Sequence, residues 1–153
     1  MNQYMKRAND LARYTMENNM GGCFGCVIVK DGIIVGEGHN TVIRDNDPTA
    51  HGEVNAIRNA CKNLNTFDLS GCELYTSAYP CPMCLGAIMW SNIKTVYYGA
   101  TAQDTGDIGF RDDFMYKWLA NQSDDVLKLI EMDREECVMV QRMWIDKSDK
   151  TEY

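Results

Sequence analysis

The stretch CVIVKDGIIVGE, residues 26–37, places two β-branched runs on either side of a turn dipeptide. The dipeptide, Asp31-Gly32, tolerates the positive φ angles of a two-residue hairpin turn. β-Branched residues favour extended backbone on both sides of it. The stretch therefore predicts an antiparallel hairpin with strands over residues 26–30 and 33–37.

Helical and extended patterns alternate on both sides of this hairpin. Before it, apolar residues recur at helical spacing over residues 2–19. The elements expected after it are a helix with Asp47 as its N-cap and Pro48 at its first position, a strand over 73–77, a helix that begins near Cys81, a strand over 93–98 and a helix over 111–120. Beyond these, residues 123–145 suit either a short helix and a strand or two helices.

This order of elements predicts an α/β fold. Helices on both faces of a sheet, with right-handed crossovers between its parallel strands, form a three-layer α/β/α sandwich. We expect a mixed five-stranded sheet that includes the N-terminal antiparallel hairpin. The sequence contains no low-complexity run or internal repeat, so we expect a single domain over residues 1–153.

The overall charge of the chain is acidic. Asp and Glu outnumber Lys and Arg by 22 to 15 among 153 residues, which gives a net charge of −7. Such a surface repels phosphate, so nucleic acid is a disfavoured partner. The sequence has no stretch approaching the ~20 apolar residues of a membrane span, and its polar N-terminus lacks a signal-peptide core. We therefore expect a cytoplasmic protein without a membrane partner.

Seven cysteines without a secretory signal favour reduced thiols over a disulfide framework. Cys23 and Cys26 form one C-x-x-C pair, which we interpret as small buried residues, with a redox role as the alternative. The other pair, Cys81 and Cys84, follows Pro80 at the expected start of a helix. Its two thiols are expected on one side of the first helical turn.

A metal site is expected where this second pair meets His51. One imidazole and two thiolates suit tetrahedral zinc and leave a fourth position for water, which is typical of a catalytic site. Glu53, two residues after His51, can move protons between water, a ring nitrogen and a departing amine. Each residue taken alone has a simpler interpretation: His51 as an ordinary histidine, Glu53 as a partner of the helix dipole, and the cysteines as a redox pair or half of a zinc ribbon.

The combination H-x-E followed by P-C-x-x-C resembles the cytidine-deaminase-like superfamily of zinc deaminases. The resemblance is carried by Gly21-Gly22-x-Phe24-Gly25, Asn40, residues 47–53, Leu74-Tyr75-Thr76-Ser77 and residues 80–88. A narrower resemblance to the bacterial guanine deaminases of cytidine-deaminase type rests on Gly109-Phe110, Asp112, Tyr116-Lys117 and Lys150-Thr151-Glu152-Tyr153.

The resemblance implies roles for individual residues. One zinc ion per subunit is bound by His51, Cys81 and Cys84, and Glu53 is the catalytic proton shuttle. The implied substrate-binding residues are Asn40, which holds the purine by hydrogen bonds, Phe24 and Trp90 on the ring pocket, Asp112 at the polar edge of guanine, Ala50, and Tyr153 as part of a lid. The family also exchanges C-terminal segments within a homodimer, which corresponds to residues 123–153 here.

The expected function is hydrolytic deamination of a free purine base, with guanine converted to xanthine and ammonia. Gly52 and Tyr79 depart from the usual alanine and glutamate of this pattern. They leave open another small aminated heterocycle, such as cytosine, guanosine, an ammeline-like triazine or a pterin. A tRNA adenosine deaminase is a further alternative, which the net charge of −7 disfavours. A non-catalytic zinc-stabilised binding module is the last alternative, and it has no need of Glu53.

Overall fold

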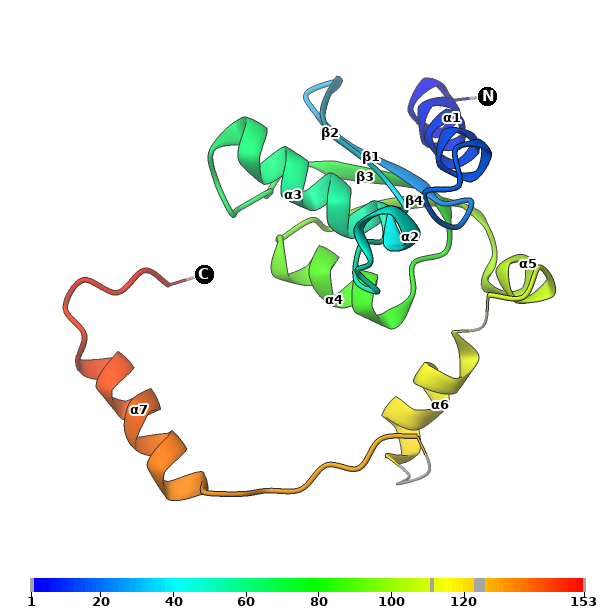
Figure 1. The fold of residues 1–153 in the computed structure, drawn as a ribbon. Coiled ribbons are helices and arrows are strands. Elements are labelled where there is room, and N and C mark those ends of the chain that lie inside the picture. The colour runs from blue at the N-terminus through cyan, green and yellow to red at the C-terminus, as the bar shows by residue number, and fades with distance from the viewer. Residues whose placement is uncertain (1, 111, 123–125, 153) are drawn as a thin grey trace. The chain divides into compact units, whose positions relative to one another are not determined.

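The structure is a computed structural model that describes residues 2–110, 112–122 and 126–152. The chain forms an N-terminal unit, Met1–Asp113, and a C-terminal unit, Phe114–Tyr153. The N-terminal unit contains the sheet (Figure 1). The residues expected at the metal site, His51, Cys81 and Cys84, also belong to it.

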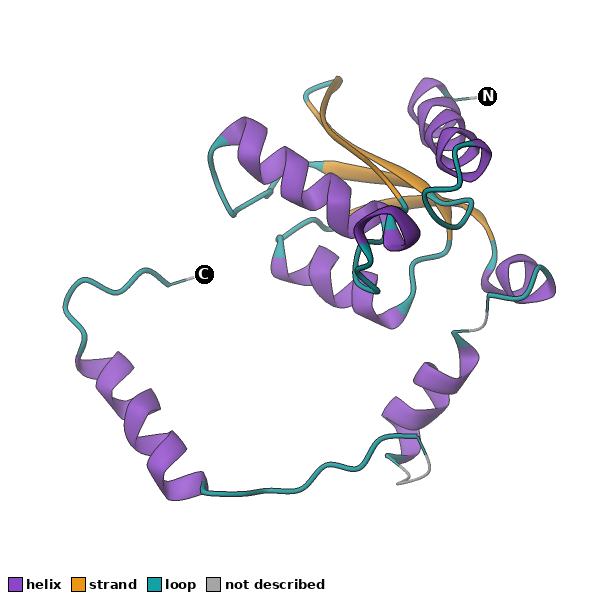
Figure 2. Ribbon diagram, in the orientation of Figure 1, coloured by secondary structure: helices purple, strands orange, loops and turns teal. Residues whose placement is uncertain are grey.

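A mixed sheet of four strands runs through the described part of the N-terminal unit (Figure 2). Its strands are β1 (Gly25–Lys30), β2 (Ile33–His39), β3 (Glu73–Ala78) and β4 (Thr95–Ala100), in the order β2-β1-β3-β4. β1 is antiparallel to both β2 and β3, whereas β3 and β4 are parallel. The predicted hairpin is confirmed, and its turn has positive φ angles of 50° at Asp31 and 78° at Gly32.

The expectation of a fifth strand was wrong for the residues that the structure describes. The apolar run over 137–140 lies within a helix, α7 (Arg134–Asp146). Glu135 and Glu136 occupy the first turn of α7, where acidic side chains complement the positive end of the helix dipole. Four consecutive apolar residues fit a buried strand and a helix equally well, so periodicity could not separate the two.

Helices cover both faces of the sheet, as predicted. α1 (Gln3–Glu17) packs Leu11 against Val27 and Val29 on one face. Cys26 and Ile28, the alternate residues of β1, point to the other face, where they meet side chains of α3 (Gly52–Leu64) and α4 (Pro82–Trp90). The three-layer α/β/α arrangement is therefore confirmed for the N-terminal unit.

The start of α3 packs very closely against the end of β2. A Cβ atom added at Gly38 would lie 2.2 Å from the carbonyl oxygen of Gly52 and 2.3 Å from the amide nitrogen of Ala56. Glycine is therefore required at position 38. This contact brings the residue after β2, Asn40, close to the residue before α3, His51.

The remaining helices are short or lie near the C-terminus. α2 (Val42–Asp45) and α5 (Ala102–Asp107) belong to the N-terminal unit, and α6 (Asp113–Asn121) begins at the boundary between the units. In the C-terminal unit, α7 exposes several large apolar side chains, including Met139, Val140 and Met143. None of the described helices is both long and apolar enough to cross a membrane.

Candidate active site

Two helix starts bring together the three residues expected to bind metal. His51 is the N-cap residue of α3, and Cys81 is the N-cap residue of α4, both with extended backbone. Pro82 occupies the first position of α4, where its fixed φ angle and missing N–H are compatible with a helix. Cys84 follows in the first turn. Both helices therefore direct the positive ends of their dipoles at the same point, which favours thiolates there.

The distances among these residues fit a zinc ion. The Nδ1 atom of His51 lies 3.6 Å from each of the sulfur atoms of Cys81 and Cys84. All three candidate ligand atoms lie within 4.8 Å of one another. Tetrahedral zinc, with bonds of about 2.3 Å to sulfur and about 2.0 Å to nitrogen, separates these atoms by about 3.5 Å. One imidazole and two thiolates thus meet the geometry and chemistry of a single Zn²⁺ site with one position left for solvent.

The electrostatics of the two thiols are asymmetric. A hydrogen bond from the Cys84 thiol lowers the pKa of Cys81 to about 4, with a smaller contribution from the His51 ring and against the opposing effect of burial. The same Cys81–Cys84 hydrogen bond and the burial of the side chain raise the pKa of Cys84. The Cys81 thiolate in turn raises the pKa of His51. One thiolate is therefore present at neutral pH, and cation binding displaces the second thiol proton.

Glu53 lies directly behind these ligands. Its side chain is 6% exposed, and its Oε1 atom accepts a hydrogen bond of 3.0 Å from the Thr76 hydroxyl on β3. Its Oε2 atom lies 3.3 Å from the Cys84 sulfur. Burial raises the pKa of Glu53 above its ordinary value, because the buried carboxylate loses hydration. The carboxyl group is thereby suited to carry a proton rather than a permanent charge.

A cavity of about 420 Å³ opens beside this cluster. His51, Glu53 and Cys81 form part of its wall. The other lining residues are Gly21, Gly22, Phe24, Asn40, Val42, Ile43, Pro48, Ala78, Tyr79, Thr105, Phe110 and Asp112. This volume lies toward the small end of the range for ligand pockets, about 300–1,000 Å³.

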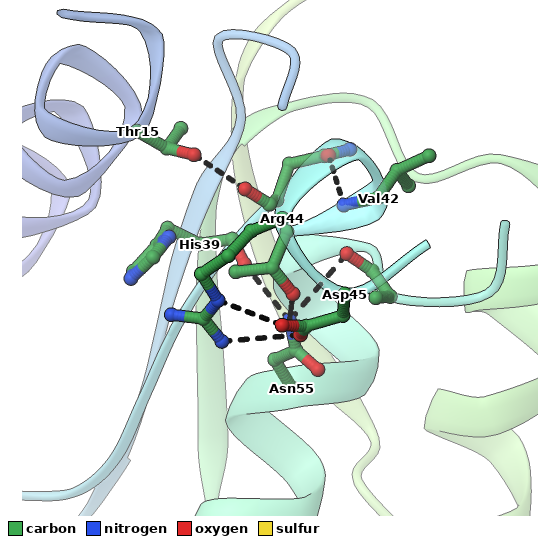
Figure 3. Close-up of polar contacts among 9 residues, drawn as sticks. Thr15, His39, Val42, Arg44, Asp45 and Asn55 are labelled. Carbon is green, nitrogen blue, oxygen red and sulfur yellow. Dashed lines mark hydrogen bonds and ion pairs between the residues drawn. The ribbon is translucent and has the colours of Figure 1, made fainter. Parts of the chain in front are cut away.

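Asn40 is held firmly at the wall of this cavity. The residue is 4% exposed, and its backbone carbonyl accepts a hydrogen bond from the buried Thr15 hydroxyl (Figure 3). Its side-chain oxygen accepts the backbone N–H of Val42 at 3.1 Å. Among the described residues no acceptor takes the Nδ2 hydrogens of Asn40, so they remain free to donate to a ligand. A Cβ atom at Gly21 would lie 2.1 Å from the Asn40 side-chain oxygen, so glycine is needed there.

The structure separates the expected substrate residues into two groups. Phe24, Asn40 and Asp112 line the cavity, and burial raises the pKa of Asp112. Ala50 is buried but is not among the lining residues. Trp90 differs from the expectation: it lies at the end of α4, is 71% exposed and is not a lining residue. Tyr153 lies outside the described residues.

Two aromatic residues that the sequence analysis did not assign also line the cavity. Phe110 contacts Phe24 edge to face, with ring centroids 4.9 Å apart. Tyr79 lies immediately before Pro80 and makes an edge contact with Tyr98 at 5.0 Å. The position of Tyr79 next to the Pro80-Cys81 motif could have indicated that it lies at the cavity. Phe110 is far from that motif in the sequence, and only the folding of the chain brings it to the cavity.

Comparison with known proteins defines the class. Residues 1–100 match the family model for the cytidine and deoxycytidylate deaminase zinc-binding region. The chain therefore belongs to the family of zinc-binding cytidine and deoxycytidylate deaminases.

Individual members of the family differ in how much of the chain they match. Guanine deaminase of Bacillus subtilis (strain 168) is 44% identical over 151 residues, which are 98% of this chain and 97% of that protein. The crystal structure of guanine deaminase from Bacillus subtilis matches with a TM-score of 0.94 at 44% identity, covering 100% of this chain and 99% of that chain. A guanine deaminase from Nitrosomonas europaea matches with a TM-score of 0.68 at 31% identity, covering 76% of this chain and 70% of that one.

A tRNA-specific adenosine deaminase from Haemophilus influenzae matches a shorter part of the chain. It is 43% identical over 103 residues, which are 67% of this chain and 60% of that protein. The similarity to the Bacillus protein thus spans nearly the whole chain, whereas the similarity to this tRNA deaminase leaves about a third of the chain unmatched.

Proposed function

We propose that this protein is a zinc-dependent aminohydrolase that converts guanine and water to xanthine and ammonia. The observation that carries the proposal is the buried Glu53 beside the donor set of His51, Cys81 and Cys84, at the wall of a cavity of about 420 Å³. The near-complete match to a guanine deaminase supports guanine as the substrate.

The cavity contains groups suited to a flat, polar ring. Phe24 and Phe110 supply aromatic surface for the ring. The free Nδ2 hydrogens of Asn40 match a ring nitrogen or carbonyl acceptor. Asp112 accepts hydrogen bonds from the N–H groups at the opposite edge of guanine. The ring is thereby bound with the carbon that bears its amino group toward His51 and Glu53.

A zinc ion held by His51, Cys81 and Cys84 would supply Lewis-acid activation of a water molecule. Glu53 accepts a proton from this water as the new C–O bond forms, and gives it to the adjacent ring nitrogen. Glu53 then transfers the second water proton to the exocyclic amine as the C–N bond breaks, and ammonia leaves. The burial that raises the pKa of Glu53 assists these alternating roles as base and acid.

Two experiments test this function: turnover of a panel of substrates, and turnover by a variant of Glu53. Ammonia release from guanine, cytosine, adenine, guanosine and ammeline is measured with the zinc-loaded protein, and guanine is expected to be the preferred substrate. Glu53→Gln should retain zinc and the fold while kcat/KM falls at least about 10²-fold, the loss typical of general acid–base catalysis. Undiminished turnover by Glu53→Gln would falsify the role of Glu53.

A separate binding assay tests the alternative that the protein is a tRNA adenosine deaminase. Salt-sensitive binding of tRNA in a gel-shift assay, together with no turnover of guanine, would favour a tRNA adenosine deaminase. The net charge of −7 argues against such a partner, because phosphate contacts require a basic surface.

We further propose that the protein is a homodimer that exchanges residues 123–153 and forms one deaminase domain per chain. The support is the apolar surface of α7, where Met139, Val140, Met143 and Ile145 are 62–68% exposed. Several large exposed apolar side chains on one helix are typical of a surface that is covered by a partner. Light scattering should give twice the 17.4 kDa mass of one chain, and a monomer at micromolar concentration would refute the dimer.

The proposal extends to the lid and to the cellular location. If Tyr153 covers the site, a chain that lacks Glu152 and Tyr153 should turn over guanine more slowly than the full chain, and an unchanged rate would remove this segment from the site.

Free Cys81 and Cys84 thiols are required for metal binding, which favours the reducing cytoplasm. Recovery of the protein from a periplasmic or membrane fraction would contradict that location.

A further inference from the structure

Helix α3 donates a row of side-chain amides to the edge strand β2. The bonds run from the Nδ2 atoms of Asn55, Asn59 and Asn63 to the carbonyl oxygens of His39, Glu37 and Val35, at 2.9, 2.8 and 2.9 Å respectively. Four helical residues rise about 6.0 Å and two strand residues about 6.6 Å, so the two periods match over this length. The row provides partners for backbone groups of a strand that lies at the edge of the sheet.

Asn55 differs from the other two members of the row because it has additional acceptors. Its Nδ2 atom also lies 2.9 Å from the hydroxyl oxygen of Thr41 and 3.4 Å from the carbonyl oxygen of Ala50 (Figure 3). The Ala50 carbonyl in turn accepts the backbone N–H of Thr41 at 2.9 Å. One amide group therefore joins the end of β2 to the segment that precedes His51.

The hydrogen bonds of Asn55 reach the residues on both sides of Asn40 in the chain. His39 precedes Asn40 and Thr41 follows it, and each accepts a bond of 2.9 Å from Asn55. The side-chain oxygen of Asn40 is held separately by the backbone N–H of Val42. Asn55 thus holds the backbone carbonyl of the residue before Asn40 and the side-chain hydroxyl of the residue after it.

We infer that Asn55 is a positioning residue for substrate, which directs the Asn40 amide into the cavity through its bonds to the His39 carbonyl and the Thr41 hydroxyl. This inference rests on the proposed function, in which Asn40 binds the purine ring. Asn59 donates an equivalent bond to Glu37, which is not a neighbour of Asn40 in the chain, whereas His39 and Thr41 flank it. Asn59 therefore shares the structural role of the row without the positioning role.

This difference makes Asn59→Ala the matched control for Asn55→Ala. In zinc-loaded protein, Asn55→Ala should raise KM for guanine about tenfold and leave kcat within about threefold, as expected when a binding contact is lost. Asn59→Ala should leave both constants within about twofold, since its bond lies away from the cavity. Both variants should retain one zinc per chain, measured by metal analysis.

Hydrogen exchange provides a readout that does not depend on turnover. The backbone amides of Thr41 and Val42 report on the segment, because they donate to Ala50 and to the Asn40 side chain. Asn55→Ala should accelerate exchange at both amides about tenfold, and Asn59→Ala should not, because local opening is governed by local bonds. If the wild-type protein does not deaminate guanine, the proposed function fails, and the exchange rates still decide the role of Asn55.

Three results would overturn the inference: equal effects of Asn55→Ala and Asn59→Ala on KM, unchanged exchange at Thr41 and Val42 in Asn55→Ala, or loss of zinc from that variant. Should Asn55→Ala fail to fold, Thr41→Val replaces it. That variant removes one acceptor of the network with little change of shape. It should raise KM for guanine in the same direction by a smaller factor, and an unchanged KM would count against the inference.

Discussion

The orientation of the proposed proton shuttle depends on a neighbouring hydroxyl, and Thr76→Val removes that hydroxyl. Thr76 is 1% exposed on β3, and its hydroxyl donates to the Oε1 atom of Glu53 at 3.0 Å. Valine has nearly the same shape, so packing of the buried site is retained. The variant therefore isolates one hydrogen bond to the carboxyl group.

The expected magnitude follows from the charge and burial of this bond. A hydrogen bond to a charged group contributes about 1.5–3 kcal/mol, and each 1.4 kcal/mol corresponds to a factor of ten in rate. Glu53 carries charge during part of the catalytic cycle and is neutral in the rest, which favours the lower end of this range. We expect kcat for guanine to fall about 10-fold to 30-fold with KM within about threefold.

Thr15→Val is the matched control for this experiment. Thr15 is also fully buried, but its hydroxyl donates to the backbone carbonyl of Asn40, on the substrate side of the cavity. It should change KM rather than kcat. Steady-state kinetics and metal analysis on both zinc-loaded variants measure the difference. Full kcat in Thr76→Val, or an equal loss of kcat in Thr15→Val, would refute the reasoning.

Two further predictions concern packing and charge. Gly38→Ala should destabilise the protein by about 3 kcal/mol in urea unfolding, because the new Cβ atom meets backbone at 2.2 Å. Gly52→Ala should stay within about 1 kcal/mol of the wild type, because the nearest atom is the Phe24 carbonyl oxygen at 3.3 Å, and equal losses in both variants would contradict this contrast. Arg7 donates two hydrogen bonds to Glu37 and lowers the pKa of that carboxyl below its ordinary 4.5. Glu37→Gln should therefore cost about 0.5 kcal/mol at pH 7, and this difference from the wild type should vanish as the pH falls below 4.5 through the lowered pKa. A difference that persists unchanged at low pH would show that charge is not its source.

Much of the fold follows from local patterns. The Asp31-Gly32 turn and its flanking strands were predictable because the dipeptide and the β-branched runs act within a few residues of each other. The start of α4 was likewise marked by Pro82. The start of α3 was predicted wrongly, because the helix begins at Gly52 and Asp47-Pro48 forms a turn before it. The apolar run over 137–140 was ambiguous for the same reason: nothing in a four-residue window distinguishes a helix from a strand, and the neighbouring chain decides it.

The candidate cysteine ligands were predictable because Pro82 marks the start of α4 in the sequence, whereas His51 was predictable from the H-x-E motif. His51 and Cys81 are N-cap residues, so a short motif determines where their side chains begin. The walls of the cavity behave differently, because Phe110 and Phe24 are 86 positions apart in the sequence and meet only after folding. Trp90 shows the reverse case: it is an aromatic residue near a ligand motif, but it is exposed and does not line the cavity.

Asn55 shows why the orientation of the binding side chains in such a site is harder to predict than the identity of its reactive groups. An asparagine in a helix is usually expected to face solvent, and Asn55, Asn59 and Asn63 recur with the period of an exposed helix face. The hydrogen bonds that each one makes depend on the register of α3 against β2. This register places the Asn55 amide among three acceptors and the Asn59 amide against a single carbonyl. If Asn40 binds the substrate as proposed, the substrate's orientation depends on tertiary register, whereas the reactive groups depend on local motif. We therefore expect substitutions on the flank of α3 to alter substrate binding without changing a metal ligand or a cavity residue.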